Sequence, residues 1–223
     1  MKFYSSPTKT LKPIKQEGTD PFFPKETKKL INELQTLDLG SLKKFYRASD
    51  KIVNHQYQNL KNPSIIGPAG WVYQGEAFRN LDIQTANQDY LRNHLIIGSA
   101  LYGITTIDTQ IIDHRLDFMK NLNGINLIDY WKPHIHKQLK DEVIVNVASN
   151  EFRQLIDGLN IIDIIFLDDN QVKSTYAKAA RGLLLRECAK LKIKDVQELK
   201  ALNILDYQFD ATLSDNKRLY FTR

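Results

Sequence analysis

The chain contains 223 residues, of which 42% are hydrophobic and 26% charged, proportions typical of a soluble globular protein that exclude a disordered or fibrous one. No stretch approaches the roughly 20 apolar residues of a membrane span and the first residues lack the apolar segment of a signal peptide, so we expect a cytoplasmic protein with no membrane partner. The net charge of +5 is concentrated in two stretches: residues 1–61 carry twelve Lys or Arg against six Asp or Glu, and residues 173–200 carry eight against three. These stretches either converge on one face that attracts a polyanion or are solvated helix faces.

The spacing of apolar residues predicts the elements of the first half of the chain. Leu30, Ile31, Leu34 and Leu37 recur at helical spacing. Ser49 is placed to cap a later helix. In order we predict a strand over residues 2–5, a loop over 6–11, a long connection over 12–24, helices over 25–37, 42–47 and 50–60, one bent or two short strands over 65–73, and a polar helix over 85–93.

The second half contains the longest apolar runs. We predict a buried strand over residues 95–99, a helix over 127–140, strands over 143–147 and 161–167 with 172–175 as a hairpin partner of the latter, a helix over 176–190, and closing strands over 207–210 and 219–222. Strands and helices alternate without a strict βαβ rhythm. The expected fold is therefore mixed α/β (α+β), a single compact domain over residues 1–223 whose central mixed sheet includes antiparallel pairs and is surrounded by helices.

The predicted helix 176–190 has one basic side. Lys178, Arg181 and Arg186 share an arc that also contains Gly182, whereas the opposite arc is apolar and contains Cys188. Since Gly182 has no side chain, this arc can approach a phosphate backbone closely; alternatively, Gly182 serves tight helix packing and the cations are solvated. Cys188, the only cysteine, is interpreted as an inert core thiol, and it excludes an intramolecular disulfide.

Two further segments carry polar residues next to strands. The loop 6–11 follows the first strand but lacks the glycines of a P-loop, so it is either a phosphate- or base-contacting loop or a simple proline turn. Asn146, Ser149 and Glu151 follow a buried strand, where open sheets place ligand sites, although Ser149 also suits a helix cap. Residues 196–209 form a helix–turn–helix-like stretch without the glycines of a phosphate-binding turn.

The sequence does not favour a metal site or a cofactor. His134 and His136 would share a face only on a strand, yet residues 131–139 are predicted to be helical, which points the two rings apart. No HxxxH or ExxH spacing occurs in the chain. We therefore predict neither a dedicated metal site nor a cofactor.

Seven ordered blocks carry a resemblance to one known family, that of the peroxide stress protein YaaA (UPF0246). The blocks are Ser6-Pro7-Thr8-Lys9-Thr10-Leu11, Ser49-Asp50-Lys51, Gly70 with Val72-Tyr73 and Gly75, Ser99-Ala100-Leu101-Tyr102-Gly103 with Arg115-Leu116, Asn146 to Phe152, Tyr176 to Gly182, and Tyr207 with Phe209-Asp210. The chain departs from the family pattern at Trp71, at Thr106-Ile107 and at Asn150. The resemblance implies a cytosolic protein of the hydrogen peroxide response that limits iron-dependent oxidative damage and binds DNA through a positively charged cleft.

The first functional hypothesis is therefore a DNA-binding stress protein with no obligatory protein partner. Binding to duplex or distorted DNA should depend on salt and show weak sequence preference, because no base-reading motif is visible. An effect on iron would be indirect. The candidate phosphate contacts are Lys9, Lys51, Arg115, Lys178, Arg181 and Arg186; Tyr73 and Tyr102 are candidate stacking residues, and Asn146 is a further candidate contact.

The alternative is an enzyme that acts on a nucleobase, nucleotide or nucleic acid. In this hypothesis the loop 6–9, Tyr102, Asn146, Ser149 and Glu151 line one pocket. Glu151 would be the acid or base, with Ser149 and Lys9 as further catalytic candidates, and Arg115 would anchor an anion. The sequence leaves open whether the protein is an enzyme.

Overall fold

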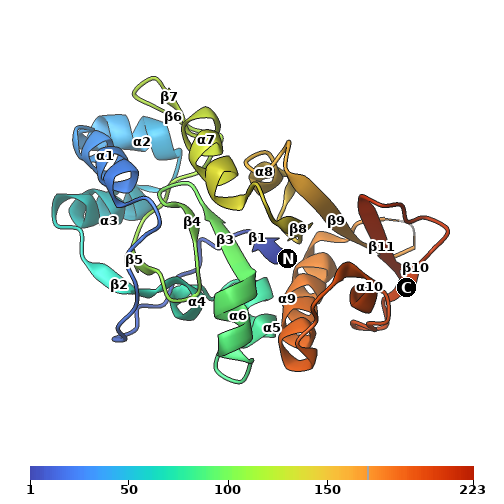
Figure 1. Ribbon diagram of the computed structural model, residues 1–223. Helices are drawn as coiled ribbons and strands as arrows, with labels where there is room; N and C mark the ends of the chain where they lie inside the picture. The colour runs from blue at the N-terminus through green and yellow to red at the C-terminus, as the bar shows by residue number, and fades with distance from the viewer. Residues whose placement is uncertain (170) are drawn as a thin grey trace.

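A computed structural model describes residues 1–169 and 171–223 of the chain (Figure 1). Its centre is a seven-stranded sheet in the order β10-β11-β9-β8-β1-β3-β4. The five inner strands are parallel, and an antiparallel strand closes each edge. The predicted mixed sheet with antiparallel pairs is thus confirmed, and the chain forms one compact α/β domain.

Each predicted strand is found in the main sheet, except those predicted at residues 65–73 and 172–175. The strands of this sheet are β1 (Lys2–Ser5), β3 (Leu95–Ser99), β4 (Gly103–Thr105), β8 (Val143–Asn146), β9 (Asn160–Leu167), β10 (Gln208–Asp210) and β11 (Arg218–Thr222). All five residues of β3 are buried, because helices and loops cover both faces of the inner strands. Two small antiparallel pairs stand apart: β2 (Ile65–Pro68) with β5 (Gln110–Ile112), and β6 (Asn121–Leu122) with β7 (Ile125–Asn126).

The helices cover the sheet on both sides. They are α1 (Pro24–Gln35), α2 (Leu39–Tyr46), α3 (Asp50–Lys61), α4 (Ala69–Val72), α5 (Glu76–Leu81), α6 (Gln88–His94), α7 (Leu127–Leu139), α8 (Asn150–Arg153), α9 (Ser174–Leu191) and α10 (Val196–Leu199). Helices α5, α6 and α9 pack together on one side, and α7 lies on the other; α1 to α3 gather beside the edge formed by β4 (Figure 1). No helix in residues 1–169 and 171–223 is long and apolar enough to cross a membrane.

Three sequence predictions about local structure are wrong. Residues 69–72 are helical rather than extended, and Gly70 packs so tightly on Ile107 that a Cβ there would lie 2.7 Å from the Cβ of Ile107. Residues 172–175 form no hairpin, because Val172 is exposed and α9 already begins at Ser174. In residues 196–209, only Val196–Leu199 is helical, and the segment then returns to the sheet as β10, so the helix–turn–helix-like stretch expected there does not form.

The parallel strands place three polar loops at the same end of the sheet. Since β1, β3 and β8 are parallel neighbours, their carboxyl ends meet, and the loops that follow them lie side by side. From β1 the chain passes to β3 on one side, whereas from β8 it passes to β9 on the other. The ends of β1 and β8 therefore flank the kind of crevice in which open α/β sheets bind ligands.

Candidate functional site

The loop 6–11 is held at both ends. The backbone amide of Ser149 donates to Oγ of Ser6 at 2.8 Å, and the two serine hydroxyls lie 3.2 Å apart. At the other end, the amide of Gln74 donates to the carbonyl of Thr10 at 2.9 Å. Gly75 permits this approach, because a Cβ there would come within 2.4 Å of Oγ1 of Thr8. The loop is thus fixed to the segments that follow β8 and α4.

Three connected hollows surround this loop, and Lys9 lines all of them. The inner pocket lies between the loops that follow β1 and β3 and the start of α8, and it is lined by Pro7, Thr8, Lys9, Leu11, Tyr73, Ser99, Ala100, His114, Arg115, Leu116, Asp117, Glu151 and Phe152. The α9 groove, of about 420 Å³, lies between the loop, α5 and α9 and contains Ser6, Ser149, Lys178 and Arg181. The α3 groove, of about 380 Å³, contains Lys51, His55, Gln56 and Arg115.

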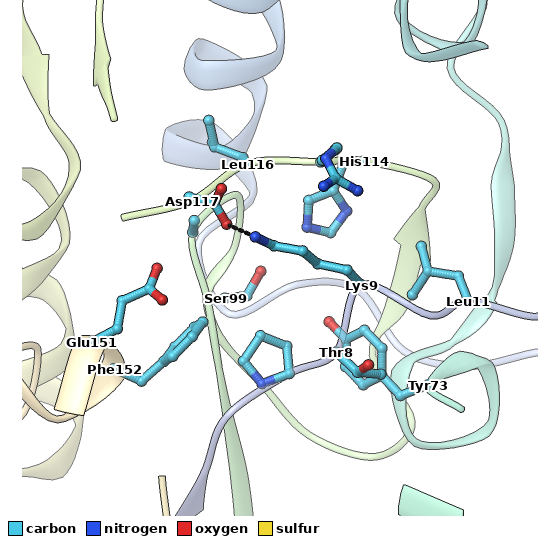
Figure 2. A pocket seen from close by; sticks show the side chains of 13 residues that line it. Thr8, Lys9, Leu11, Tyr73, Ser99, His114, Leu116, Asp117, Glu151 and Phe152 are labelled. Atoms are coloured by element: carbon cyan, nitrogen blue, oxygen red, sulfur yellow. Dashed lines mark ion pairs between the residues drawn. The ribbon is translucent and has the colours of Figure 1, made fainter. Parts of the chain in front are cut away.

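The charged side chains that line the inner pocket are those of Lys9, Arg115, Asp117 and Glu151. Nζ of Lys9 forms an ion pair with Oδ1 of Asp117 at 2.8 Å, with Glu151 and Phe152 on one side of the pair and Tyr73 on the other (Figure 2). Burial and the negative charge of Asp117 raise the pKa of Glu151, although Lys9 and the Phe118 amide oppose the shift. Glu151 therefore keeps its proton to higher pH than an ordinary glutamate, as an acid or base near neutral pH requires.

Two uncharged polar groups complete the inner pocket. The side chain of Tyr73 is buried, and its hydroxyl has no hydrogen-bond partner in the described part of the chain. Burial holds the pKa of this hydroxyl far above its ordinary value, so it stays protonated and can donate. Nδ1 of His114 donates to the carbonyl of Ile112 at 3.0 Å, and burial lowers the pKa of the ring, which favours the neutral form.

The grooves contain two arginines that lack the carboxylate partner found at most other arginines, and two further lysines. Six of the nine arginines pair with an acidic side chain: Arg79, Arg92, Arg153, Arg186, Arg218 and Arg223. Within residues 1–169 and 171–223, by contrast, no ion pair forms at Lys51, Arg115, Lys178 or Arg181. Arg181 is partly buried, its Nε has no hydrogen-bond partner there, and burial lowers the pKa of its guanidinium. Such a group is stabilised by an anionic ligand.

Most of the predicted site residues come together around these hollows. The residues that line at least one of them are Lys9, Lys51, Tyr73, Arg115, Ser149, Glu151, Lys178 and Arg181. Asn146 lies in a neighbouring hollow of about 510 Å³ that shares Lys178 and Arg181 with the α9 groove. Its amide is already used inside the protein: Nδ2 donates to Asp163 at 2.6 Å and Oδ1 accepts from the Ala148 amide at 2.9 Å. Asn146 thus shapes the turn after β8.

The two tyrosines do not have the surface needed for base stacking. Tyr73 is 2% exposed and Tyr102 is 3% exposed, so neither ring presents a free face. The hydroxyl of Tyr102 accepts a hydrogen bond from the Ile112 amide at 2.8 Å and anchors β5. We therefore correct the prediction for both: Tyr102 is a core residue, and Tyr73 reaches the inner pocket only through its hydroxyl.

In helix α9 the structure decides between the two alternatives for Gly182 and corrects the prediction for Arg186. A Cβ at Gly182 would lie 2.0 Å from the carbonyl oxygen of Ala77, so Gly182 permits the close packing of α9 on α5 and does not face a phosphate groove. Arg186 donates to Thr85 at 3.1 Å and pairs with Asp82 at 3.7 Å, and it lines none of the three hollows. The buried position of Cys188 agrees with its interpretation as a core thiol.

Sequence reasoning missed the residues that complete the two polar hollows. Asp117 and His114 flank the Arg115-Leu116 block, but they have no distinguishing spacing, and only the fold brings them opposite Lys9 and Glu151. Gln56 reaches the α3 groove from α3, and its Oε1 has no partner in the described residues. In the part of the chain that the structure covers, no three His, Cys, Asp or Glu side chains gather into a group that could hold a metal ion.

Comparison with known proteins agrees with the resemblance carried by the sequence blocks. The model of the family described as "Peroxide stress protein YaaA" matches residues 1–213. A UPF0246 protein of Fusobacterium nucleatum is 29% identical over 100% of this chain and 99% of its own length, and one of Francisella tularensis subsp. novicida is 30% identical over 98% of both. A UPF0246 protein of Desulfitobacterium hafniense is 31% identical over 91% of this chain and 89% of its own. These matches show that the chain belongs to the YaaA family of peroxide stress proteins.

Proposed function

We propose that this protein binds DNA through the basic grooves on either side of the loop 6–11. The observation that carries the proposal is the grouping of cations in the grooves, Lys51 and Arg115 in the α3 groove and Lys178 and Arg181 in the α9 groove. Arg115 and Arg181 form no ion pair within the described residues, whereas six of the nine arginines do. Lys9 stands where the grooves meet, but its ion pair with Asp117 makes it a weaker candidate for a phosphate contact than these four cations. Cations held without internal partners are available to neutralise phosphates.

The neighbouring groups suit a phosphate backbone rather than base edges. The hydroxyls of Ser6, Thr8 and Ser149 lie in the α9 groove beside Lys178 and Arg181 and can donate to phosphate oxygens. Helix α9 packs Ala177 and Ala180 into the core, so its flank, not its tip, meets the groove. Contacts of this kind give salt-dependent binding with weak sequence preference.

In the cell, this activity would protect DNA during peroxide stress. We propose a cytoplasmic protein that limits iron-dependent damage by binding DNA, with an indirect effect on iron. The family membership supports the link to peroxide, and the basic grooves support the link to DNA.

The test compares two double variants on the same helix. Lys178→Ala/Arg181→Ala removes two groove cations, and Lys190→Ala/Arg186→Ala removes the same charge from outside the grooves. Labelled duplex DNA is titrated by fluorescence anisotropy across a salt series. We expect the groove variant to bind more weakly and to lower the slope of log affinity against log salt by about two, with the control close to wild type. Equal loss in both variants would indicate a general effect of charge and contradict a specific groove.

The inner pocket supports a second candidate function, an enzyme acting on a nucleobase, nucleotide or nucleic acid. The specific observation is Glu151, whose pKa is raised beside the Lys9–Asp117 ion pair. A carboxyl that keeps its proton to higher pH suits the role of a general acid. Glu151→Gln separates the two functions, because turnover would be lost whereas DNA binding would remain or strengthen slightly.

A further inference from the structure

Polar groups without partners gather around the loop 6–11. Seven buried side-chain polar atoms in residues 1–169 and 171–223 have no hydrogen-bond partner, and three of them line the connected hollows: the Tyr73 hydroxyl, Nε of Arg181 and Oε1 of Gln56. Each such atom destabilises the protein by about 1–3 kcal/mol unless something else pairs with it. Their position in the hollows means that a molecule bound there is one source of the missing partners.

Building on the proposed DNA binding, we propose that the inner pocket and the α9 groove together hold one unpaired nucleotide, with its base in the inner pocket and its phosphate at Arg181 and Lys178. The occupant is either a free nucleotide or a nucleotide without a pairing partner in a strand. Both offer the same chemistry, a neutral heterocycle joined to one anionic phosphate.

The charged residues of the two hollows indicate which hollow holds the base and which holds the phosphate. Asp117 and Glu151 line the inner pocket together with Lys9 and Arg115, so this pocket offers a phosphate no excess of positive charge. In the α9 groove Lys178 and Arg181 have no acidic partner among the described residues, and Arg181 is partly buried. The excess of positive charge therefore lies in the α9 groove, which assigns the phosphate to that groove and the neutral base to the inner pocket.

The polar groups of the inner pocket suit the edge of a nucleobase. The Tyr73 hydroxyl and Nζ of Lys9 are donors, and the carboxyls of Asp117 and Glu151 are acceptors. A nucleobase edge presents donors and acceptors side by side, whereas a phosphodiester presents only acceptors. A base paired in a duplex has already used this edge, and therefore the occupant must be unpaired.

The two hollows adjoin each other, as one ligand that reaches both requires. Pro7, Thr8, Lys9 and Phe152 line the inner pocket and the α9 groove alike. The Phe152 ring packs edge-on against Phe118, with ring centroids 5.1 Å apart, and this contact holds it as an apolar side of both hollows. An aromatic wall beside a polar pocket favours a flat heterocycle.

Tyr73 gives the sharpest test, because Tyr73→Phe removes the unpartnered hydroxyl and keeps the packed ring. The variant should be as stable as wild type or slightly more stable in the absence of DNA, because a buried unpaired group is lost. We would measure anisotropy with three duplexes: one fully paired, one with a single unpaired nucleotide, and one with an abasic site at the unpaired position. The abasic duplex keeps the distortion and removes the base.

We expect wild type to bind the unpaired nucleotide about tenfold more tightly than the abasic control, the equivalent of about 1.4 kcal/mol. Tyr73→Phe should lose most of this preference and bind the paired duplex as wild type does. Equal affinity of wild type for the unpaired and abasic duplexes, with salt-dependent duplex binding intact, would overturn the nucleotide site alone. No binding to any duplex at moderate salt would overturn the proposed DNA binding as well.

Competition distinguishes the two sources of the nucleotide. If a deoxynucleoside 5′-monophosphate abolishes the preference and inorganic phosphate at the same concentration does not, free nucleotides also occupy the site. If the preference survives both competitors, the occupant is a nucleotide within a strand. The wild-type comparison does not depend on any variant, so the proposal stays testable even if Tyr73→Phe does not fold.

Discussion

The backbone amide of Ser149 donates a hydrogen bond to Oγ of Ser6 at 2.8 Å, and this bond joins the loops that leave two neighbouring parallel strands. It spans the point at which the chain turns to opposite sides of the sheet. On one side of it lies Lys9, on the other the start of α8 with Glu151. The hydrogen bond therefore sets the separation of the groups that line the inner pocket and the α9 groove.

The first prediction concerns this bond. Ser6→Ala leaves the Ser149 amide without its acceptor, which should lower the free energy of unfolding by about 1 kcal/mol and the melting temperature by about 2–4 °C. DNA affinity should fall more than in a stability-matched variant, because the loop that carries Lys9 loses an anchor. Ser64→Ala, at an exposed serine, is the control for calorimetry and anisotropy. Unchanged melting in both variants would show that the bond contributes nothing.

The second prediction concerns the packing of α9 on α5. In Gly182→Ala the new Cβ would lie 2.0 Å from the carbonyl oxygen of Ala77, so the helices must separate. Denaturant unfolding should show a loss of about 3 kcal/mol or more. Gly40→Ala, which places a Cβ 3.6 Å from Asp38 in α2, should be neutral or stabilising. Similar stability for the two variants would mean that the contact relaxes without cost.

The third prediction concerns pH. Because the pKa of Glu151 is raised in the folded protein, its contribution to stability is fully present below the ordinary value of 4.5 and is lost as pH rises through the raised value. At neutral pH the charged form opposes folding. Glu151→Gln should therefore lose this pH dependence and equal or exceed the wild-type melting temperature at pH 7. A parallel melting series from pH 4 to 8, with exposed Glu17→Gln as control, checks this; a large loss of stability at pH 7 would contradict it.

The fourth prediction concerns the buried carboxyl of Asp168, which accepts hydrogen bonds from Tyr207 and from Nε of Arg223, the latter at 2.6 Å. Burial alone would raise its pKa, but these two donors hold the pKa below its ordinary value. The resulting stability is present above pH 3.8 and is lost as pH falls through the lowered pKa.

Asp168→Asn should thus melt at clearly lower temperature than wild type at pH 7 and differ little from it in strong acid. The Arg223 guanidinium also lies over the rings of Tyr176 and Tyr207, so the loss should extend to the start of α9. Hydrogen exchange of α9 amides reports this extension. An equal deficit at both pH values would show that the change acts through packing instead of charge.

Local patterns were enough to determine most of the fold. The run Leu95–Ser99 predicts a buried strand because a strand covered on both faces needs continuous apolar residues, and the apolar arc of residues 176–190 predicts a helix packed on one side. The start of α9 and the helical turn at residues 69–72 escaped prediction, since the tertiary contact of Gly70 with Ile107, not local propensity, selects the turn.

The sequence by itself also determined the family and the chemistry of the candidate site, because Lys9, Ser149, Glu151, Lys178 and Arg181 stand in recognisable blocks. Only the tertiary structure decided how they are used. Tyr102 is buried and cannot stack on a base, and Arg186 forms an internal ion pair with Asp82. The fold also brought Asp117 opposite Lys9 from more than a hundred residues away. The ion-pair partners of a side chain, its burial and the charges near a carboxyl all depend on distances in space. The spacing of residues along the chain does not give these distances.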